Sequence, residues 1–322
     1  MINNNKISVV IPAYNEEKLI AKTINTMPEE ADYLIVINDN SKDGTLEIVK
    51  ELEYKNKKIV LINQEKNYGV GKAIKTGYKK SIELNSDISV VMPGDAQALP
   101  EDFLKIVKPV SEGVADYSKG NRLKHKDVKE IMPKYRYIGN TFLSLFTKFA
   151  SGYFHIMDPQ MGYTAMSNRV LKKINLDSLI ERYGYPGHLL HLLNLVDARV
   201  CDVNITPHYG EERSGLRVWN ILPKLTFLLT YLFVKRVFSK LIVNNLGPAG
   251  ISYFLSFLIF FIIEPFLLVR LNTLYNSLDY VPELTFILVV NFLLIFFILF
   301  LFALMFDIQE NKEISIKIPD IE

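Results

Sequence analysis

The sequence contains a single cysteine, Cys201, among 322 residues. One cysteine cannot form an internal disulfide, which excludes a disulfide-stapled secreted domain and fits a reducing compartment. The opening residues, Met1–Lys6, lack the apolar core of a signal peptide, so we expect the front of the chain to stay in the cytoplasm. The sequence also lacks internal repeats and a low-complexity linker.

Acidic residues are absent between Glu212 and Glu264, whereas basic residues continue through this stretch. Its first part, Val218–Val243, mixes aromatic side chains with lysine and arginine, and Pro223 divides it. This pattern predicts two amphipathic helices that lie in a membrane interface with their cations toward the lipid headgroups. Buried core helices are the alternative.

Two long apolar runs follow, Ile251–Val269 and Leu284–Phe306. Each is long enough to cross a bilayer, which takes about 20 residues, and Glu264 lies near the far end of the first. The link Asn272–Glu283 has no lysine or arginine, unlike the stretch before the first run. The positive-inside rule therefore predicts a cell-membrane protein with two spans, whose catalytic domain and C-terminal tail are cytoplasmic.

The front of the chain alternates short apolar runs with helical segments, which is the pattern of parallel βαβ units. Strands are predicted at Ile7–Ile11, Leu34–Ile37, Ile59–Ile62, Ser89–Met92, Ala115–Ser118 and Ala198–Ile205. The sequence therefore predicts an α/β fold with a mostly parallel central sheet. In such sheets ligands bind just beyond the carboxyl ends of the strands.

Polar or glycine residues follow each of the first three strands. Asn15 is placed to cap the next helix, and Asp39 can accept bonds from ribose hydroxyls or base amides. Gly69 and Gly71 permit close backbone approach, the helix that they open offers N–H groups to phosphate, and Lys72 adds a cation. This pair lacks the third glycine of the dinucleotide fingerprint, which excludes a Rossmann dehydrogenase.

The fourth strand breaks at Pro93–Gly94, and a carboxylate, Asp95, follows at once. Gln97 adds a carboxamide oxygen two residues later. Two oxygen ligands at this spacing suit Mg²⁺ or Mn²⁺ held jointly with substrate phosphates. A simple turn is the alternative, because proline, glycine and aspartate are turn residues.

Together the strand ends resemble family 2 glycosyltransferases, which have the GT-A fold, and among them the dolichyl- or polyprenyl-phosphate sugar synthases. The segments that carry the resemblance are Val10–Glu17, Asn38–Thr45, Asn67–Ala73 and Gly94–Gln97. The resemblance implies that four residues bind the nucleotide base and ribose: Pro12, Tyr14, Glu16 and Asp39. It also implies that Asp95 and Gln97 hold the divalent metal on the diphosphate.

Two departures from the family pattern concern acidic residues. Pro93 stands where the family usually has the first aspartate of Asp-x-Asp, and Asn38 replaces another frequent aspartate. With one metal carboxylate missing, the metal would be held weakly or chiefly by the substrate diphosphate.

For the acceptor side, the resemblance implies that Arg122 and Arg136 bind the acceptor phosphate and that Arg213 clamps the diphosphate. Asp158, before Pro159, would be a general base or would position the acceptor. A phosphomonoester has a second pKa of about 6 and needs little deprotonation, which favours positioning. A turn cap is the alternative for Asp158.

The predicted organisation is a catalytic GT-A domain at 1–214, interface helices at 215–245, a transmembrane hairpin at 246–306 and a cytoplasmic tail at 307–322. The predicted activity is inverting transfer of one sugar from GDP-mannose, UDP-glucose or UDP-N-acetylglucosamine to dolichyl or polyprenyl phosphate. The expected partners are therefore this nucleotide-sugar donor, the lipid phosphate and membrane lipids, without nucleic acid. The rivals are a transferase that extends a lipid-linked glycan or polysaccharide, and an inactive nucleotide-sugar sensor motivated by Pro93.

Overall fold

The computed structural model describes residues 2–96, 98–124, 128, 132, 134–208 and 218–318, and only the backbone at 134–136 and 218–220. The chain divides into two compact units. The first comprises Met1–Leu232 with Glu313–Glu322, and the second comprises Phe233–Lys312.

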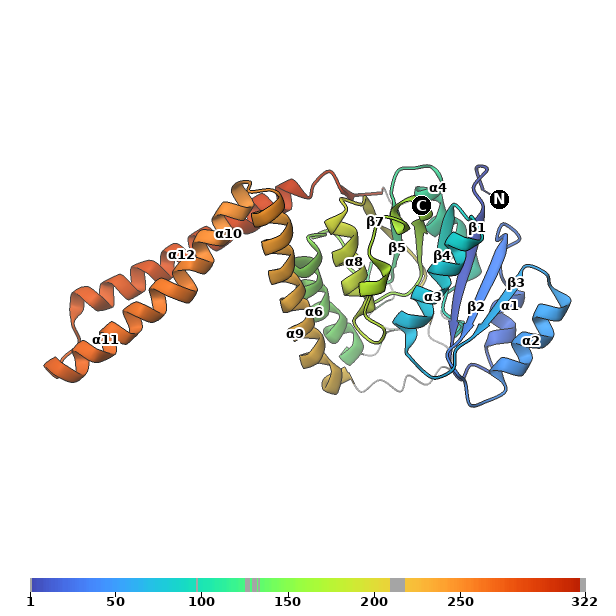
Figure 1. Ribbon diagram of the computed structural model, residues 1–322, viewed down its shortest axis with the longest axis horizontal. Coiled ribbons are helices and arrows are strands. Elements are labelled where there is room, and N and C mark those ends of the chain that lie inside the picture. The colour runs from blue at the N-terminus through green and yellow to red at the C-terminus, as the bar shows by residue number, and fades with distance from the viewer. Residues whose placement is uncertain are drawn as a thin grey trace. The chain divides into compact units, whose positions relative to one another are not determined.

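The first unit is built around one sheet, whose described strands lie in the order β3-β2-β1-β4-β6-β5-β7-β8 (Figure 1). The strands are β1 (Ile7–Ala13), β2 (Tyr33–Asn38), β3 (Ile59–Asn63), β4 (Ile88–Val91), β5 (Tyr117–Asn121), β6 (Thr164–Ser167), β7 (Val200–Asn204) and β8 (Ser315–Ile316). Only β6 is antiparallel to its neighbours, β4 and β5. The predicted mostly parallel sheet is confirmed, and β6 and β8 are additions that the sequence analysis did not anticipate.

Helices cover both faces of this sheet (Figure 1). The helices of the first unit are α1 (Ile20–Asn25), α2 (Thr45–Lys55), α3 (Val70–Glu83), α4 (Phe103–Ser111), α6 (Lys134–Ser151), α7 (Asn168–Leu171), α8 (Tyr185–Leu195) and most of α9 (Val218–Arg236), with 3₁₀ turns at Pro100–Asp102 and Leu176–Ser178. Side chains of α1, α2 and α4 form the core on one face, and those of α3, α7 and α8 form it on the other.

Strand β1 lies inside the sheet, and all seven of its residues are buried. Burial on both faces explains its nearly continuous apolar sequence, which is typical of parallel sheets. Because β1 to β4 are parallel, their carboxyl ends meet at one edge. The loops that the sequence analysis selected therefore lie together at this edge.

Helix α9 passes through Pro223 without interruption, so the predicted division at this proline is wrong. The helix begins only five residues earlier, and the proline removes one hydrogen bond, to the carbonyl of residue 219. Leu229 and Leu232 of α9 are buried with Leu143 of α6, whereas Phe227 is 78% exposed. This part of α9 thus has one face in the core and one apolar face open.

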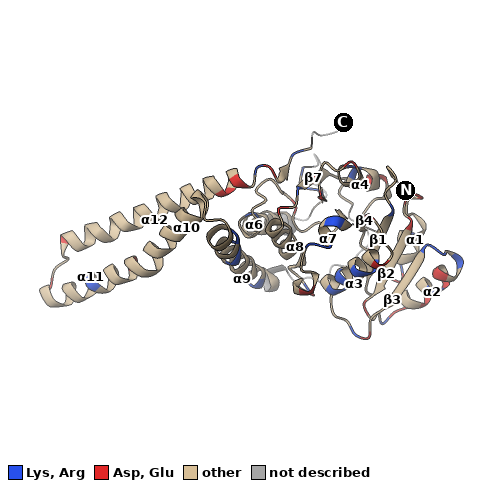
Figure 2. Ribbon diagram, turned by 45° about the horizontal axis from the view of Figure 1, so that its top comes forward, with Lys and Arg blue, Asp and Glu red and all other residues tan. Residues whose placement is uncertain are grey.

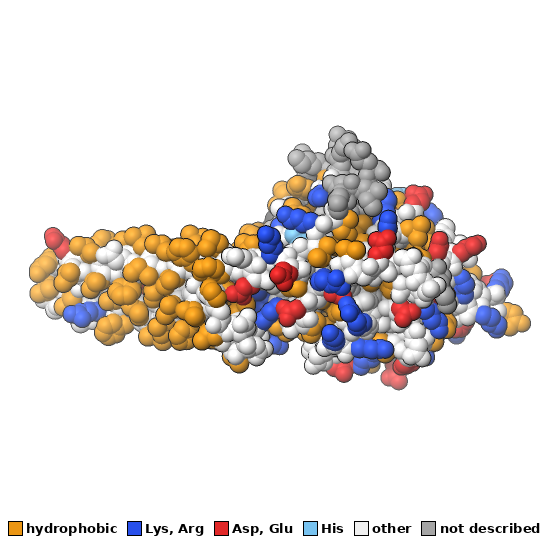
Figure 3. Space-filling view, turned by 90° about the horizontal axis from the view of Figure 1, so that it is seen from above, with side chains coloured by type: hydrophobic (Ala, Val, Ile, Leu, Met, Phe, Trp, Pro, Cys, Tyr) orange, Lys and Arg blue, Asp and Glu red, His pale blue; other side chains and the backbone are white. Residues whose placement is uncertain are grey.

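The second unit contains two helices that are long and apolar enough to cross a membrane, Pro248–Leu278 and Glu283–Glu310. The first comprises α10 (Pro248–Leu258), a π-helical segment (Ile259–Ile263) and α11 (Glu264–Leu278), and the second is α12 (Glu283–Glu310). Only 22% and 11% of their most apolar windows are buried, unlike core helices of a soluble protein. Figure 2 shows few charged residues along them, and Figure 3 shows apolar side chains covering the visible face.

Two details of the second unit differ from the sequence analysis. The first long helix continues to Leu278, so Glu264 lies near its middle and not near its far end. Helix α12 continues past Phe306 to Glu310, and after it Ser315–Ile316 joins the sheet of the first unit as β8. The predicted tail is therefore partly helix and partly strand.

A buried polar cluster lies near the first turns of α10 and the last turns of α12. The guanidinium of Arg236 donates two hydrogen bonds to Asp307, at 2.8 and 2.6 Å, and both side chains are fully buried. Tyr253 and Asn311 donate to the same carboxylate. These hydrogen bonds and the ion pair offset the free-energy cost of removing the Asp307 carboxylate from water.

Candidate active site

The loops after β1 and β2 are joined by hydrogen bonds at the carboxyl edge of the sheet. The Asn15 Oδ1 accepts from the Lys42 amide at 2.8 Å, and the Glu16 amide donates to the Thr45 hydroxyl at 2.8 Å. Asn15 has a φ of 57°, and α1 begins only at Ile20, so the predicted capping role of Asn15 is wrong. The side chain instead fixes the second loop against the first.

The predicted nucleotide-binding residues of these loops lie along this edge. Pro12 is next to the last residue of β1, and its carbonyl accepts from the Gly94 amide at 3.2 Å, which places it beside the end of β4. Tyr14 follows with 44% of its side chain exposed. An exposed ring beside backbone groups of two strand ends suits stacking against a base.

Asp39 is buried, and both of its carboxylate oxygens accept backbone hydrogen bonds. The Tyr68 amide donates at 2.9 Å and the Gly69 amide at 2.7 Å. Asp39 therefore holds the loop that leads into α3. A carboxylate can accept about four bonds, so the predicted contact with ribose or base would be made in addition to these two.

The glycines before α3 approach another segment of the chain. A Cβ on Gly71 would lie 2.1 Å from the Ile180 carbonyl oxygen, and one on Gly69 would lie 2.8 Å from the Arg182 side chain. The Lys72 amide donates to the Glu181 carbonyl at 2.9 Å, and the Lys72 ammonium lies 3.3 Å from the Glu181 carboxylate. Protein thus covers part of the start of α3 and occupies the Lys72 amide, and the expectation that this helix offers N–H groups to phosphate stays a prediction.

Replacing Gly71 by alanine should lower the stability of the first unit by about 1–3 kcal/mol, because the methyl group would collide with the Ile180 carbonyl. Thermal unfolding and calorimetric titration with nucleotide would measure the two effects separately. Lys79→Ala, at an exposed position of the same helix, is the control. Weaker nucleotide binding without loss of stability would favour the phosphate-binding interpretation instead.

Asp95 follows β4 at the same edge of the sheet. Its strand end is fixed because the Gly94 carbonyl accepts from the Thr23 hydroxyl at 3.1 Å, and Ala96 has a φ of 56°, which turns the chain sharply. Burial and the nearby Asp95 charge raise the pKa of the Tyr185 hydroxyl. The structure therefore places Asp95 near the beginning of α8. Gln97 lies outside the described residues.

Arg122 and Asp158 form a buried ion pair at the end of β5. The Arg122 Nε donates to Asp158 Oδ2 at 2.8 Å and a terminal nitrogen donates to Oδ1 at 3.2 Å. The Asp158 side chain is fully buried, and that of Arg122 is 12% exposed. The two predicted acceptor-site residues, 36 positions apart in the sequence, are thus brought together.

The other two predicted arginines have no described side chain. Arg136 is in the first turn of α6, where only the backbone is described, and Arg213 lies outside the described residues. Their roles stay predictions.

A cavity of about 220 Å³ lies among α6, α8 and α9 of the first unit. Its lining is mostly apolar, with a few amide and phenol groups: Asn140, Leu143, Gln160, Tyr183, Gly184, Tyr185, Pro186, Ile221, Leu222 and Leu225. Tyr185 connects it with Asp95, and Gln160 is two residues from Asp158. The cavity therefore shares Tyr185 with the neighbourhood of Asp95 and Gln160 with the chain segment that carries Asp158.

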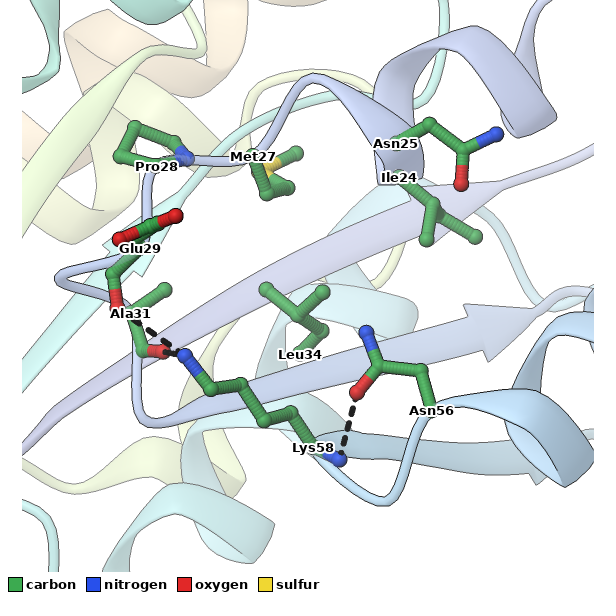
Figure 4. A pocket seen from close by; sticks show the side chains of 9 residues that line it. All are labelled: Ile24, Asn25, Met27, Pro28, Glu29, Ala31, Leu34, Asn56 and Lys58. Atoms are coloured by element: carbon green, nitrogen blue, oxygen red, sulfur yellow. Dashed lines mark hydrogen bonds between the residues drawn. The ribbon is translucent and has the colours of Figure 1, made fainter.

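A second cavity, of about 250 Å³, lies at the opposite, amino ends of β2 and β3 (Figure 4). Lys58 reaches across it, and its ammonium donates to the carbonyls of Glu29 and Ala31 at 3.0 and 2.8 Å. Its ammonium is thus already bonded to the chain, and this cavity is remote from the carboxyl edge.

Comparison with known proteins identifies the family. Residues 8–174 match the model of the protein family described as "Glycosyl transferase family 2". The chain belongs to glycosyl transferase family 2. It is thus a glycosyltransferase, as the sequence analysis predicted.

Named relatives of this glycosyltransferase act on dolichyl lipids. A UDP-N-acetylglucosamine–dolichyl-phosphate N-acetylglucosaminyltransferase of Methanococcus voltae is 36% identical over 218 residues, which cover 64% of this chain and 86% of the relative. A dolichol-phosphate mannosyltransferase of Pyrococcus furiosus is 29% identical over 179 residues, covering 54% of this chain and 49% of the relative.

A solved structure confirms the GT-A fold. Glucosyl-3-phosphoglycerate synthase of Mycobacterium tuberculosis, in complex with Mn²⁺, UDP and glucosyl-3-phosphoglycerate, superposes with a TM-score of 0.54 at 20% identity. The match covers 72% of this chain and 80% of that chain.

The described residues of this glycosyltransferase fit a divalent metal that is shared with a substrate. They contain no group of three histidine, cysteine, aspartate or glutamate side chains able to hold an ion alone. Asp95 supplies one carboxylate beyond the end of β4, and Pro93 occupies the position of a second. Mg²⁺ is commonly bound by one or two carboxylates plus substrate phosphates, so this ligand set suits an ion that arrives with a diphosphate.

Two charged residues of the glycosyltransferase were not selected from the sequence, Lys119, which is buried on β5, and Asp202, which is partly buried on β7. Burial lowers the pKa of the Lys119 ammonium to about 8, opposed by the charges of Asp158 and Asp202. Burial raises the pKa of the Asp202 carboxyl to about 7, opposed by a backbone bond from Met157 and by the Lys119 charge. The sequence feature that could have revealed them is a basic or acidic residue within or directly after a predicted strand.

The raised pKa of Asp202 predicts a pH-dependent stability. Between its ordinary value of 3.8 and about 7, the folded state keeps the proton that the unfolded state releases, so Asp202 makes stability fall as pH rises. His155, whose pKa burial lowers to about 4, acts in the opposite sense.

Comparison with Asp202→Asn isolates the Asp202 contribution. From pH 5 to 7 the thermal midpoint of the wild type should fall relative to that of the variant. The fall should be about 2–4 °C for each kcal/mol of unfolding free energy that is lost. Lys119, Lys124 and Asp158 are the charges that act on Asp202, and they are the same in both proteins. Parallel pH profiles would contradict the assigned shift.

Proposed function

We propose that this glycosyltransferase moves one sugar from a nucleotide-sugar donor to the phosphate of a dolichyl or polyprenyl lipid. The observation that carries the proposal is the mostly apolar cavity lined by Tyr185, which lies near Asp95, and by Gln160, which is two residues along the chain from Asp158. Such a chamber suits the first isoprene units of an acceptor whose phosphate binds Arg122. The names of both relatives, which contain dolichyl or dolichol phosphate, support the same acceptor.

For the sugar donor, we propose UDP-N-acetylglucosamine as the first candidate. The relative from Methanococcus voltae, at 36% identity, carries this donor in its name. GDP-mannose and UDP-glucose are the other donors to test, because other relatives are named as mannosyl- and glucosyltransferases.

In the proposed reaction a lipid phosphate oxygen forms a bond to the anomeric carbon, while the bond from that carbon to the diphosphate breaks. Attack opposite the leaving group inverts the anomeric configuration. The phosphate needs no strong base, since its second pKa is about 6. Both Asp158 oxygens accept bonds from Arg122, so we assign Asp158 to orienting this guanidinium.

The proposed leaving group is held by residues at the strand ends. Asp95 and Gln97 would ligate Mg²⁺ or Mn²⁺, which when bound neutralises charge on the diphosphate. Arg213 would add a planar fork of N–H donors to the same group. Pro12, Tyr14, Glu16 and Asp39 would bind the nucleoside, and Lys72 would contribute positive charge near it.

We further propose a location in the cell membrane with the catalytic unit on the cytoplasmic side. Two helices of 31 and 28 residues are long enough to cross a bilayer. The lysines and arginines of α9 precede the first of them, whereas the turn at 279–282 between the two contains none. The positive-inside rule supports this orientation.

A donor screen tests the function. Membranes containing the protein would be incubated with polyprenyl phosphate, Mg²⁺ or Mn²⁺, and one labelled donor at a time, and label would be counted in the organic extract. Transfer from one donor as a single sugar supports the proposal and identifies the donor.

A longer glycan product would move the function to chain extension. Nucleotide binding without transfer from any donor would refute the proposal. It would favour an inactive nucleotide-sugar sensor, the alternative suggested by the proline at position 93. Chelation by EDTA, followed by restoration with Mg²⁺ or Mn²⁺, tests the metal separately.

A further inference from the structure

Lys119 and Asp202 are charged side chains inside the sheet that the proposed reaction does not use directly. They are register partners on the parallel strands β5 and β7, and Lys119 is 1% exposed. One oxygen of Asp202 is buried without a hydrogen-bond partner among the described residues. A buried charge such as that of Lys119 destabilises a fold more than an apolar residue of similar size would, so its placement calls for a role.

Asp202 holds the two segments that carry the Arg122–Asp158 pair. Its Oδ2 accepts from the Met157 amide at 2.8 Å, directly before Asp158. The same oxygen accepts from the Asn121 carboxamide at 3.0 Å, directly before Arg122. One carboxylate oxygen therefore holds the Met157 backbone just ahead of Asp158 and the Asn121 side chain just ahead of Arg122.

The far sides of both partners are fixed as well. The ammonium of Lys119 donates a hydrogen bond to the Met161 carbonyl. This bond holds the other end of the segment 157–161, which contains Asp158. The oxygen of the Asn121 carboxamide accepts from the Leu123 amide at 3.0 Å, on the other side of Arg122. Asp158 thus lies between two backbone positions held by Asp202 and Lys119, and Arg122 lies between Asn121, whose side chain is held by Asp202, and Leu123, whose backbone is held by Asn121.

We propose that Asp202 and Lys119 are positioning residues that hold Arg122 at the place where it binds the acceptor phosphate. This inference rests on the proposed function. Asp202 acts through Asn121 and Met157, and Lys119 acts through Met161. Neither side chain touches the substrates.

The charges of the neighbourhood agree with a phosphate site. Lys119, Arg122, Lys124 and Lys148 are cations that interact electrostatically with Asp158 or Asp202. The four cations outnumber these two carboxyl groups, and protonation of Asp202, whose pKa burial raises to about 7, only increases the excess of positive charge. A phosphomonoester carries about −1.5 to −2 charges at pH 7, so its arrival would balance the cluster.

The test compares Asp202→Ala, Asp202→Asn and Lys119→Met in the full-length protein. Steady-state kinetics would give KM for polyprenyl phosphate, KM for the sugar donor and the rate of donor hydrolysis by water. Asp202→Ala and Lys119→Met should raise the acceptor KM by roughly 10- to 100-fold, because small misplacement of a binding group is costly. The donor KM and the hydrolysis rate should stay unchanged.

Two variants separate positioning from stability. Asp202→Asn keeps an oxygen that can accept both hydrogen bonds, so it should recover most of the acceptor affinity. Asp116 is a matched control, because this buried carboxylate lies just before β5 and binds Arg169 and Arg199 away from the site. Asp116→Asn should lower the thermal midpoint without changing the acceptor KM.

Binding of geranyl phosphate, measured by calorimetry, decides the outcome without turnover. Variants that transfer sugar and bind this probe as the wild type does would overturn the inference. The same holds if donor and acceptor KM rise together as the thermal midpoint falls. A wild type that binds the probe but transfers no sugar refutes the proposed function alone, and the variants still test the positioning. A wild type that does neither refutes both.

Discussion

Replacing Asp95 by alanine should reduce sugar transfer to polyprenyl phosphate by roughly 100- to 1,000-fold, the usual effect of removing one group that stabilises developing charge. The carboxylate stands beyond the end of β4, and no described group of three metal-binding side chains offers a substitute for it. Because Pro93 replaces a second carboxylate, the loss of Asp95 leaves a metal to be held mainly by the diphosphate.

The measurement is label transfer in membranes at saturating Mg²⁺ or Mn²⁺. Asp87→Asn is the matched control, because Asp87 precedes the amino end of β4 and accepts from the Lys6 amide at 2.8 Å. It should keep near-normal transfer. An Asp95→Ala protein that retains more than about a tenth of the activity would show that the diphosphate is stabilised elsewhere.

The central strands could be predicted because burial on both faces leaves a simple record in the sequence. Ile7–Ile11 and Ile59–Ile62 were read as strands from their β-branched runs, and the structure extends them only to Ala13 and Asn63. Strand β6, Thr164–Ser167, has no such run. It is defined by antiparallel pairing with β4 and β5, a tertiary effect that local sequence does not contain.

At the site, position along the chain was easier to predict than the partner of each side chain. Asp95 lies beyond a parallel strand, as expected from its place after the apolar run. Gly69 and Gly71 are points of close approach, as predicted, but the neighbour in the structure is the segment around Ile180, whereas the predicted neighbour was a phosphate. Close approach of a phosphate and close approach of another backbone segment both require a residue without a Cβ. Only the fold therefore distinguishes the two.

Charged residues within strands were the weakest point of the sequence analysis. Lys119 and Asp202 are 83 positions apart, and only the parallel pairing of β5 and β7 makes them neighbours. For Asp158 the sequence left a turn cap as the alternative to a site residue. Its full burial against Arg122 shows that it does more than end a turn.

Replacing Arg122 by methionine should lower stability by about 3–5 kcal/mol, because it leaves the Asp158 carboxylate buried without its partner. It should also raise the acceptor KM by about 100-fold, as expected when charge-assisted hydrogen bonds to a phosphate are lost. Thermal unfolding and acceptor kinetics measure the two effects. Arg169→Met, which removes an arginine that is 69% exposed from another ion pair, is the control and should change neither strongly.

The double variant Arg122→Met with Asp158→Leu separates the two roles of the pair. Removing both charges replaces a buried ion pair by apolar groups, which is often neutral or stabilising, so most of the lost stability should return. The acceptor KM should stay high, because no guanidinium remains to bind phosphate. If the double variant instead regains normal use of the acceptor, Arg122 serves only the fold, and the acceptor phosphate must bind elsewhere. Recovery of stability without recovery of acceptor binding would place the functional role in the guanidinium and the orienting role in Asp158.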